Sequence, residues 1–260
     1  CGDISNPEDL QLLKEEKWDV IFHQAAISNT TVTDQNLVLK VNANSFIFFV
    51  DLALSNSCYL IYASSAGIYG NSIAPNTIGI GEEPKNIYGY SKLLMDNYTR
   101  SVIKDKTNAK IIGLRYFNVY GPGEFYKGKT ASMILQLGLQ ILADHRVKLF
   151  KYGEQFRDFV YIDDVVNANL NALESFSGIY NIGYGMRRSF NDIVKLLGES
   201  LNLNVEIDYI DNPYQFYQND TCANIDTSRA KLNYQPVYNL EKGIEKYTAE
   251  IIKIHKAITK

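Results

Sequence analysis

The stretch Tyr59-Leu-Ile-Tyr-Ala-Ser-Ser65 decides the fold. Its apolar residues follow one another without alternation, which is typical of a strand buried on both faces of a parallel sheet. Two other runs have this character, Asp19-Val-Ile-Phe-His23 before it and Ile111–Tyr116 after it. Helical patterns at about 34–55 and 88–102 separate the three runs. This alternation predicts an α/β fold with a doubly wound, Rossmann-like parallel sheet and right-handed crossovers.

The remainder of the chain predicts a smaller α+β portion. Its patterns indicate helices at about 130–143, 189–201 and 239–257, and short strands at 147–150, 159–162, 178–182 and 205–210. We assign residues 1–117 and about 157–183 to the Rossmann-like domain, and about 118–156 and 184–260 to the smaller portion. A helix also begins near Asn6-Pro7, where a capping residue precedes a proline in the first turn.

Composition and charge exclude several classes of protein. With 260 residues, of which 46% are hydrophobic and 21% charged, the chain can bury a large core and is neither disordered nor a small disulfide scaffold. A formal charge of −3 gives no strong positive field, so we expect neither a nucleic-acid nor a membrane partner. The three scattered cysteines lack metal-ligand spacing and indicate a reducing, cytoplasmic environment without a metal site.

Polar clusters at 24–31, 64–70 and 116–129 follow the carboxyl ends of the three buried strands. A doubly wound sheet binds its ligand outside those ends, so we expect the site there. Tyr88 and Lys92 lie four residues apart at a helix start and project from one face. A nearby ammonium stabilises a phenolate and lowers its pKa, which suits a proton shuttle. Tyr238 and Lys242 repeat the spacing without polar strand ends nearby, so we expect Tyr238 to be a surface or packing residue.

Four runs occur in one order at fitting intervals. They are Tyr62-Ala-Ser-Ser-Ala-Gly-Ile-Tyr-Gly70, Tyr88-Gly-Tyr-Ser-Lys92, Arg115-Tyr-Phe-Asn-Val-Tyr-Gly-Pro122 and Arg157-Asp-Phe-Val-Tyr-Ile-Asp-Asp-Val165. Together they resemble the extended short-chain dehydrogenase/reductases that act on nucleotide sugars, over essentially the whole chain. Ser-Ser-Ala at 64–66 resembles the epimerases and reductases of that family, whereas its dehydratases usually carry Thr-Asp-Glu there.

The run Lys127-Gly-Lys-Thr-Ala-Ser-Met133 resembles the Lys-Gly-x-x-Ala-Ser segment of the ADP-L-glycero-D-manno-heptose 6-epimerase subfamily. The runs at 150–159 and 216–218 fit the same subfamily, although Gly123, Tyr126 and Phe216 replace an Arg, a His and an Arg that are often found there. The resemblance implies interconversion of ADP-D-glycero- and ADP-L-glycero-β-D-manno-heptose by transient oxidation and reduction at C6″, for lipopolysaccharide inner-core biosynthesis. It also implies bound NADP and a homo-oligomer, for example a pentamer.

Two alternatives stay open. One is a UDP-hexose 4-epimerase or a related nucleotide-sugar reductase, against which the Lys127 segment argues. The other is a non-catalytic nucleotide-sugar-binding remnant.

The resemblance implies a role for each catalytic candidate. Tyr88 is the acid/base for a hydroxyl proton, Lys92 binds the nicotinamide ribose and lowers the pKa of Tyr88, and Ser65 hydrogen-bonds the reacting oxygen. Lys127 is a second acid/base facing Tyr88 across the sugar. The structural alternatives are a strand-end turn for Ser65, and for Lys127 a solvated loop lysine or a counter-charge to phosphate.

The resemblance also implies two sets of binding residues, in an NADP-binding Rossmann domain and a substrate-binding portion. The cofactor set is Asp3, Ile4, Gln24, Ala25, Ala26, Ile27, Ser28, Asn42, Lys92 and Val119. The substrate set is Ser65, Asn118, Lys129, Gln136, Phe150, Lys151, Tyr152, Gly153, Arg157 and Tyr217. For Arg157, an ion pair with Asp158 is the structural alternative to a diphosphate contact. We expect His23 to pack at its strand end rather than to bind metal.

The sequence before Asp3 lacks the Gly-x-x-Gly-x-x-Gly turn with which members of the family hold the cofactor pyrophosphate. We therefore expect that roughly 55–70 residues of βαβ structure precede this segment in a whole family member. Without them we expect an exposed apolar sheet edge and poor cofactor retention. The residues that choose between NAD and NADP lie in that part, so only the resemblance favours NADP.

Overall fold

The computed structural model describes residues 1–106, 108–213 and 218–259. Its strands are β1 (Val20–His23), β2 (Tyr59–Ser65), β3 (Ile111–Tyr116), β4 (Asn118–Tyr120), β5 (Arg146–Phe150), β6 (Phe156–Tyr161), β7 (Gly178–Ile182), β8 (Arg187–Ser189) and β9 (Glu206–Ile210). Its α-helices are α1 (Pro7–Leu12), α2 (Gln35–Val38), α3 (Ser45–Asn56), α4 (Ile87–Asp105), α5 (Met133–Asp144), α6 (Ile162–Asn171), α7 (Phe190–Leu201), α8 (Asp226–Leu232) and α9 (Leu240–Ile258). Shorter helical turns are η1 (Leu13–Glu15), η2 (Leu39–Asn44), η3 (Ala66–Tyr69), η4 (Phe125–Thr130) and η5 (Ala172–Glu174).

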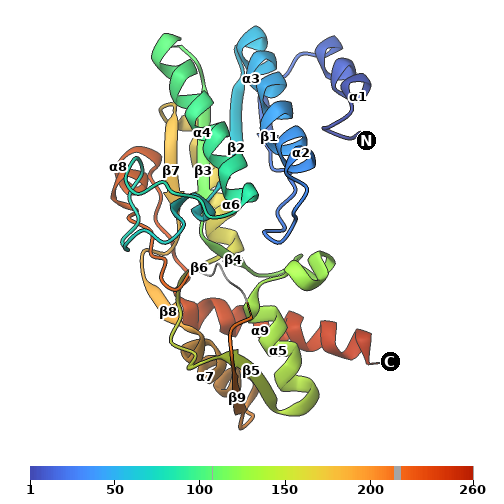
Figure 1. Ribbon diagram of the computed structural model, residues 1–260, viewed down its shortest axis with the longest axis vertical. Helices are drawn as coiled ribbons and strands as arrows, with labels where there is room; N and C mark the ends of the chain where they lie inside the picture. Colours follow the sequence, from blue (N-terminus) through green and yellow to red (C-terminus); the bar gives the residue numbers. More distant parts are fainter. Residues whose placement is uncertain (107, 214–217, 260) are drawn as a thin grey trace.

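The predicted doubly wound parallel sheet is confirmed. Strands β1, β2, β3 and β7 pair in that order and all run parallel, with Ile21 beside Leu60 and Leu60 beside Ile111. Side chains alternate between the faces, so Tyr62 packs with Phe46 of α3 on one side and Ile61 joins the core under α6 and α8 on the other. Helices therefore cover both faces of the sheet (Figure 1). Strand β1 lies at one end of this sheet.

The predicted helix at about 34–55 is present, with an internal irregularity. Asp34 caps α2 by accepting a hydrogen bond from the Leu37 backbone at 3.0 Å, and the π-helical turn η2 joins α2 to α3. By length and composition the stretch from Gln35 to Asn56 is apolar enough to cross a membrane. In the fold it packs on β1 and β2, with Phe46 and Val50 fully buried, as a core helix does.

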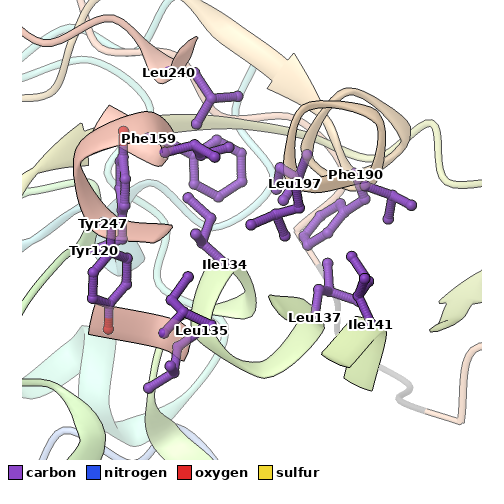
Figure 2. Packing of buried hydrophobic residues seen from close by; sticks show 14 of the residues in the cluster. Tyr120, Ile134, Leu135, Leu137, Ile141, Phe159, Phe190, Leu197, Leu240 and Tyr247 are labelled. Carbon is purple, nitrogen blue, oxygen red and sulfur yellow. The ribbon is translucent and has the colours of Figure 1, made fainter. Parts of the chain in front are cut away.

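A second core lies beside α5, α7 and α9, in the lower half of Figure 1. Figure 2 shows Ile134 and Leu137 of α5, Phe190 and Leu197 of α7 and Tyr247 of α9 in this cluster. The short parallel pair β5–β9 and the three-stranded sheet β4–β6–β8 adjoin these helices. The sequence predicted the three helices and the strands β5 and β9, because each is marked by its own hydrophobic pattern, but it did not predict that the two strands pair.

Four elements were missed by the sequence-based prediction: β4, β8, α6 and α8. Strands β4 and β8 have three residues each, too few to show a period. The predicted strand at 159–162 is shifted, because β6 ends at Tyr161 and α6 begins at Ile162. Acidic Asp163 and Asp164 in the first turn of α6 favour that helix start.

Candidate active site

A cavity of about 830 Å³ lies at the carboxyl ends of β2 and β3. The turn after β1, the start of α4, one side of α6 and the segment at 127–133 complete its wall. It brings together four catalytic candidates that the sequence separates widely: Ser65, Tyr88, Lys92 and Lys127. The predicted binding residues Gln24, Ala26, Ser28, Asn118 and Val119 also line it. The cavity thus lies at the edge of the sheet where the sequence predicted the site.

Tyr88 faces Ser65 because two capped turns meet there. Asn86 caps α4 by accepting a hydrogen bond from the Gly89 backbone at 2.8 Å. Ser65 ends β2, and its Oγ accepts from the Gly67 backbone at 3.0 Å. Burial raises the pKa of Tyr88 above its ordinary value, and a hydrogen bond with Ser65 opposes that shift. The side chains of Tyr88 and Ser65 therefore meet through a hydrogen bond at the wall of the cavity.

Lys92 lies almost wholly buried beneath the same wall. Its Nζ donates to the Ala63 carbonyl at 2.7 Å and lies 6.0 Å from the centre of the Tyr88 ring. Burial lowers the pKa of Lys92 to about 8, against the opposing charge of Asp96. The expected lowering of the Tyr88 pKa by Lys92 is not seen here, because the effect of burial on the phenol dominates and the ammonium is directed at Ala63.

Asp96 organises a buried network one turn beyond Lys92, which the sequence analysis missed. Its carboxylate accepts hydrogen bonds from Tyr62 at 2.8 Å, from Ser64 at 3.0 Å and from Arg115 at 2.7 Å. Arg115 also pairs with Glu82 at 2.7 Å. The signal in the sequence was the spacing, since Asp96 follows Lys92 by four residues and faces the same strands. The network fixes α4 to β2 and β3, and with it the positions of Tyr88 and Ser65.

Three side chains close the cavity on the side of α6. The Tyr116 hydroxyl donates to Gln24 Oε1 at 2.9 Å and accepts from Asn169 Nδ2 at 2.9 Å. Gln24 Nε2 donates in turn to Asn169 Oδ1 at 3.3 Å. Burial raises the pKa of Tyr116 to about 12, so it stays a neutral hydrogen-bonding group. Sequence reasoning found Gln24 but missed Asn169, since α6 was not predicted, and it did not assign Tyr116 a role in the site.

The cofactor candidates follow a path leading away from Tyr88. A neighbouring cavity of about 430 Å³ is lined by Asp3, Ile4, Gln24 and Ala25, and it shares Phe22 and Gln24 with the larger one.

Asn42 holds the turn on this path. It accepts from the Ile27 backbone N–H at 2.8 Å and donates to the Ile27 carbonyl at 3.0 Å. Asn42 also donates to Ser91 at 3.0 Å, and Ser91 donates to the Tyr88 carbonyl at 2.7 Å. The turn at 25–28 is thereby tied to the start of α4.

Lys127 and Lys129 lie exposed on η4, between the two cores, and Lys127 lines the larger cavity. The predicted substrate residue Gln136 uses its amide nitrogen within the chain, donating to the Ala131 carbonyl at 2.7 Å and to the Lys129 carbonyl at 3.3 Å. It supports the loop that carries the two lysines.

Five further substrate candidates lie outside the lining of the larger cavity. Phe150, Lys151, Tyr152 and Gly153 follow one another at the end of β5, where Lys151 pairs with Asp211 at 2.8 Å. Arg157 is buried, donates to the Phe156 carbonyl at 2.9 Å and lies over the Phe190 ring. Tyr217 lies outside the described residues, as does Phe216. Among the residues described, no cluster of three or more His, Cys, Asp or Glu side chains is arranged to hold a metal ion.

Comparison with known proteins gives three kinds of match. The model of the NAD dependent epimerase/dehydratase family matches residues 1–183. An ADP-L-glycero-D-manno-heptose-6-epimerase of Brachyspira hyodysenteriae is 38% identical over 267 aligned residues, which cover 96% of this chain and 83% of that protein. The crystal structure of the Helicobacter pylori ADP-L-glycero-D-manno-heptose-6-epimerase has 48% identity and a TM-score of 0.90, over 96% of this chain and 78% of that one.

A UDP-glucose 4-epimerase of Thermotoga maritima, solved with UDP-glucose, is also similar, with 26% identity and a TM-score of 0.88 over 97% of this chain and 84% of that one. These likenesses agree with the site, where a tyrosine and a lysine meet at the carboxyl edge of a doubly wound sheet. On the matched domain, the site and the relatives together, the chain belongs to the NAD dependent epimerase/dehydratase family.

Proposed function

We propose that this protein is an ADP-heptose 6-epimerase, which inverts C6″ of ADP-D-glycero-β-D-manno-heptose to give the L-glycero epimer. The observation that carries the proposal is that one cavity is lined by both Tyr88 and Lys127, which come from different parts of the fold and can each transfer a proton. The names of the two relatives at 38% and 48% identity support the choice of substrate.

Two acid/base groups suit an epimerisation for a geometric reason. Inversion requires that hydride leaves one face of the carbon and returns to the other, so the reacting oxygen is presented in two orientations. Tyr88 and Lys127 serve one orientation each: one takes the hydroxyl proton as the carbon is oxidised, and the other returns a proton as it is reduced. Ser65 holds the oxygen beside Tyr88.

The residues present fit a nicotinamide dinucleotide, which when bound supplies the hydride acceptor. An ammonium has three donors, and the Ala63 carbonyl is the acceptor it uses here, so Lys92 retains donors for ribose hydroxyls. The adjoining cavity at Asp3 and Ile4 gives room for the adenine end. We assign the cofactor as NADP, in a Rossmann domain of residues 1–117 and about 157–183.

In this proposal, residues 118–156 and 184–260 bind the nucleotide part of the substrate. The contacts are made by Asn118, Lys129, Phe150–Gly153 and Arg157. The product serves the lipopolysaccharide inner core. The enzyme acts in the cytoplasm as a homo-oligomer, for example a pentamer.

The test is to incubate the protein with cofactor and the D-glycero substrate, and to follow the C6″ configuration by NMR. The expected result is an equilibrium mixture of the two epimers, and a Tyr88→Phe variant should lose activity by a factor of about 100 or more because one proton transfer is lost. Turnover of UDP-glucose in place of ADP-heptose would instead identify a UDP-hexose 4-epimerase. A Tyr88→Phe variant with full activity would rule out the role of Tyr88.

A further inference from the structure

Glu124 is a buried carboxylate at the base of the loop that carries Lys127. Its side chain is 6% exposed. One oxygen accepts from the Ser132 backbone N–H at 2.6 Å, and the other accepts from the Ser132 hydroxyl at 2.8 Å and from the Gly121 backbone N–H at 3.3 Å. The carboxylate therefore ties together the two ends of the segment 121–132, which we call the lysine arm.

Further hydrogen bonds connect Glu124 to Lys127 within the lysine arm and, through Ser132, to helix α5. The Lys127 backbone N–H donates to the Glu124 carbonyl at 2.9 Å, and the Thr130 hydroxyl donates to the Lys127 carbonyl at 2.9 Å. Ser132, held by Glu124, caps α5 by accepting from the Leu135 backbone at 3.3 Å. The arm is thereby fixed to a helix of the second core.

The lysine arm needs the hydrogen bonds of Glu124 because its glycines give its backbone wide conformational freedom. Gly121, Gly123 and Gly128 have φ angles of 138°, 91° and 55°, a region that glycine enters without cost. Phe125 and Tyr126 are exposed and give the arm little apolar anchorage. On the other side Glu124 packs beside Tyr247 of α9, where burial and then the charge of Glu124 raise the pKa of that tyrosine.

We propose that Glu124 is a positioning residue for Lys127: by closing the lysine arm it holds the Lys127 ammonium at the cavity that Tyr88 also lines. This inference rests on the proposed function, in which Lys127 is the second acid/base. Sequence reasoning did not reach Glu124, because only the fold shows that its carboxylate faces the ends of its own loop.

The experiment compares turnover of ADP-heptose in Glu124→Gln, Lys127→Ala and the double variant. Glutamine keeps the volume but has one acceptor oxygen, so it cannot hold Gly121 and both Ser132 donors together. We expect Glu124→Gln to lower kcat at least about tenfold with a nearly unchanged KM, since a misplaced group costs rate rather than binding. Because Glu124 acts through Lys127, the double variant should turn over no more slowly than Lys127→Ala alone.

The matched control is Asp164→Asn. Asp164 is also buried and holds another segment by accepting from the Val237 and Tyr238 backbone N–H groups at 2.9 and 3.1 Å, so its loss should lower the melting temperature without changing kcat. If Glu124→Gln does not fold, Ser132→Ala removes one of the three donors and should give a smaller fall in kcat.

Independent effects that multiply in the double variant would overturn the inference, as would a Glu124→Gln enzyme with normal kcat. Failure of the proposed function looks different: the parent enzyme does not epimerise ADP-heptose, or Lys127→Ala is fully active. In that event Glu124 has no lysine to position and the inference falls with it.

Discussion

The side chain of His23 packs in the hydrophobic core at the end of β1, next to the candidate site. It ends β1, is 4% exposed and stacks on Phe49 and Phe46 at centroid distances of 4.4 and 5.9 Å. Its Nε2 makes no hydrogen bond with any described residue. Burial, with a smaller contribution from the charge of Lys92, lowers the pKa of His23 to about 3. The sequence-based expectation that His23 packs at its strand end is confirmed.

His23 should make stability depend on pH. The pKa of His23 is lower in the folded state than its ordinary value of 6.5, so the unfolded chain binds a proton more readily than the folded one. The stability that neutral His23 contributes is therefore complete above pH 6.5 and is lost as the pH falls toward 3. From about pH 7.5 to about pH 5.5 the free energy of unfolding should fall by about 1 kcal/mol through this residue. A His23→Leu variant should lose this part of the pH dependence of the unfolding free energy, which urea unfolding at several pH values measures. The exposed His145→Asn control should keep the slope, and an unchanged slope in His23→Leu would contradict the assignment.

At the scale of elements, the start of α4 rests directly on the turn η3. A Cβ added to Gly89 would come within 2.6 Å of the Gly67 carbonyl, a backbone atom that cannot turn aside. This close approach sets the distance from Tyr88 of α4 to Ser65 at the end of β2. The site therefore requires glycine at position 89, although glycine inside a helix otherwise destabilises that helix.

A Gly89→Ala variant should push α4 away from η3. We expect a loss of about 1–3 kcal/mol in stability from overpacking and a fall in kcat, because Tyr88 moves away from Ser65. Equilibrium unfolding and steady-state kinetics measure the two effects. The exposed Ser101→Ala change on the same helix is the control and should leave both unchanged. A fully active Gly89→Ala enzyme would show that the contact does not position Tyr88.

At the scale of the whole molecule, Asp158 joins segments that are far apart in the chain. Its buried carboxylate on β6 accepts from the backbone N–H groups of Tyr184 at 2.7 Å, Gly185 at 2.9 Å and Ala223 at 2.9 Å. Through these bonds the segment leading into α8 is held against the end of β7. Desolvation raises the pKa of Asp158 to about 7, in spite of the three donors.

An Asp158→Ala variant should open this junction. Three buried donors would lose their acceptor, so we expect a loss of about 3 kcal/mol or more in the free energy of unfolding. Faster amide hydrogen exchange should appear at Tyr184, Gly185 and Ala223. The control is Asp163→Ala, which removes a partly exposed ion pair with Lys246 and should cost less than about 1 kcal/mol. Equal effects in the two variants would contradict this account.

The elements that the sequence predicted share a property: their pattern is local. The strands at 59–65 and 111–116 are continuous apolar runs, and the caps Asn6, Asp34 and Ser189 mark helix starts without reference to distant residues. The missed elements lack such signals, as β4 and β8 show. The candidate site divides in the same way. Tyr88, Lys92 and Ser65 follow from spacing and motif order, whereas Asp96, Tyr116 and Asn169 matter through contacts across the fold.

By itself, the sequence determined the class of fold and singled out Tyr88, Lys92 and the edge of the sheet at which the candidate cavity lies, because hydrophobic periods and strand ends can be recognised from neighbouring residues. Only the tertiary structure decided the electrostatics. The pKa of Tyr88 is raised rather than lowered, because burial is a property of the packed state. It also decided that Gln136 supports a loop, and that Lys127 and Tyr88 share a cavity. These properties depend on distances between segments that are far apart in the chain, which the order of neighbouring residues does not reveal.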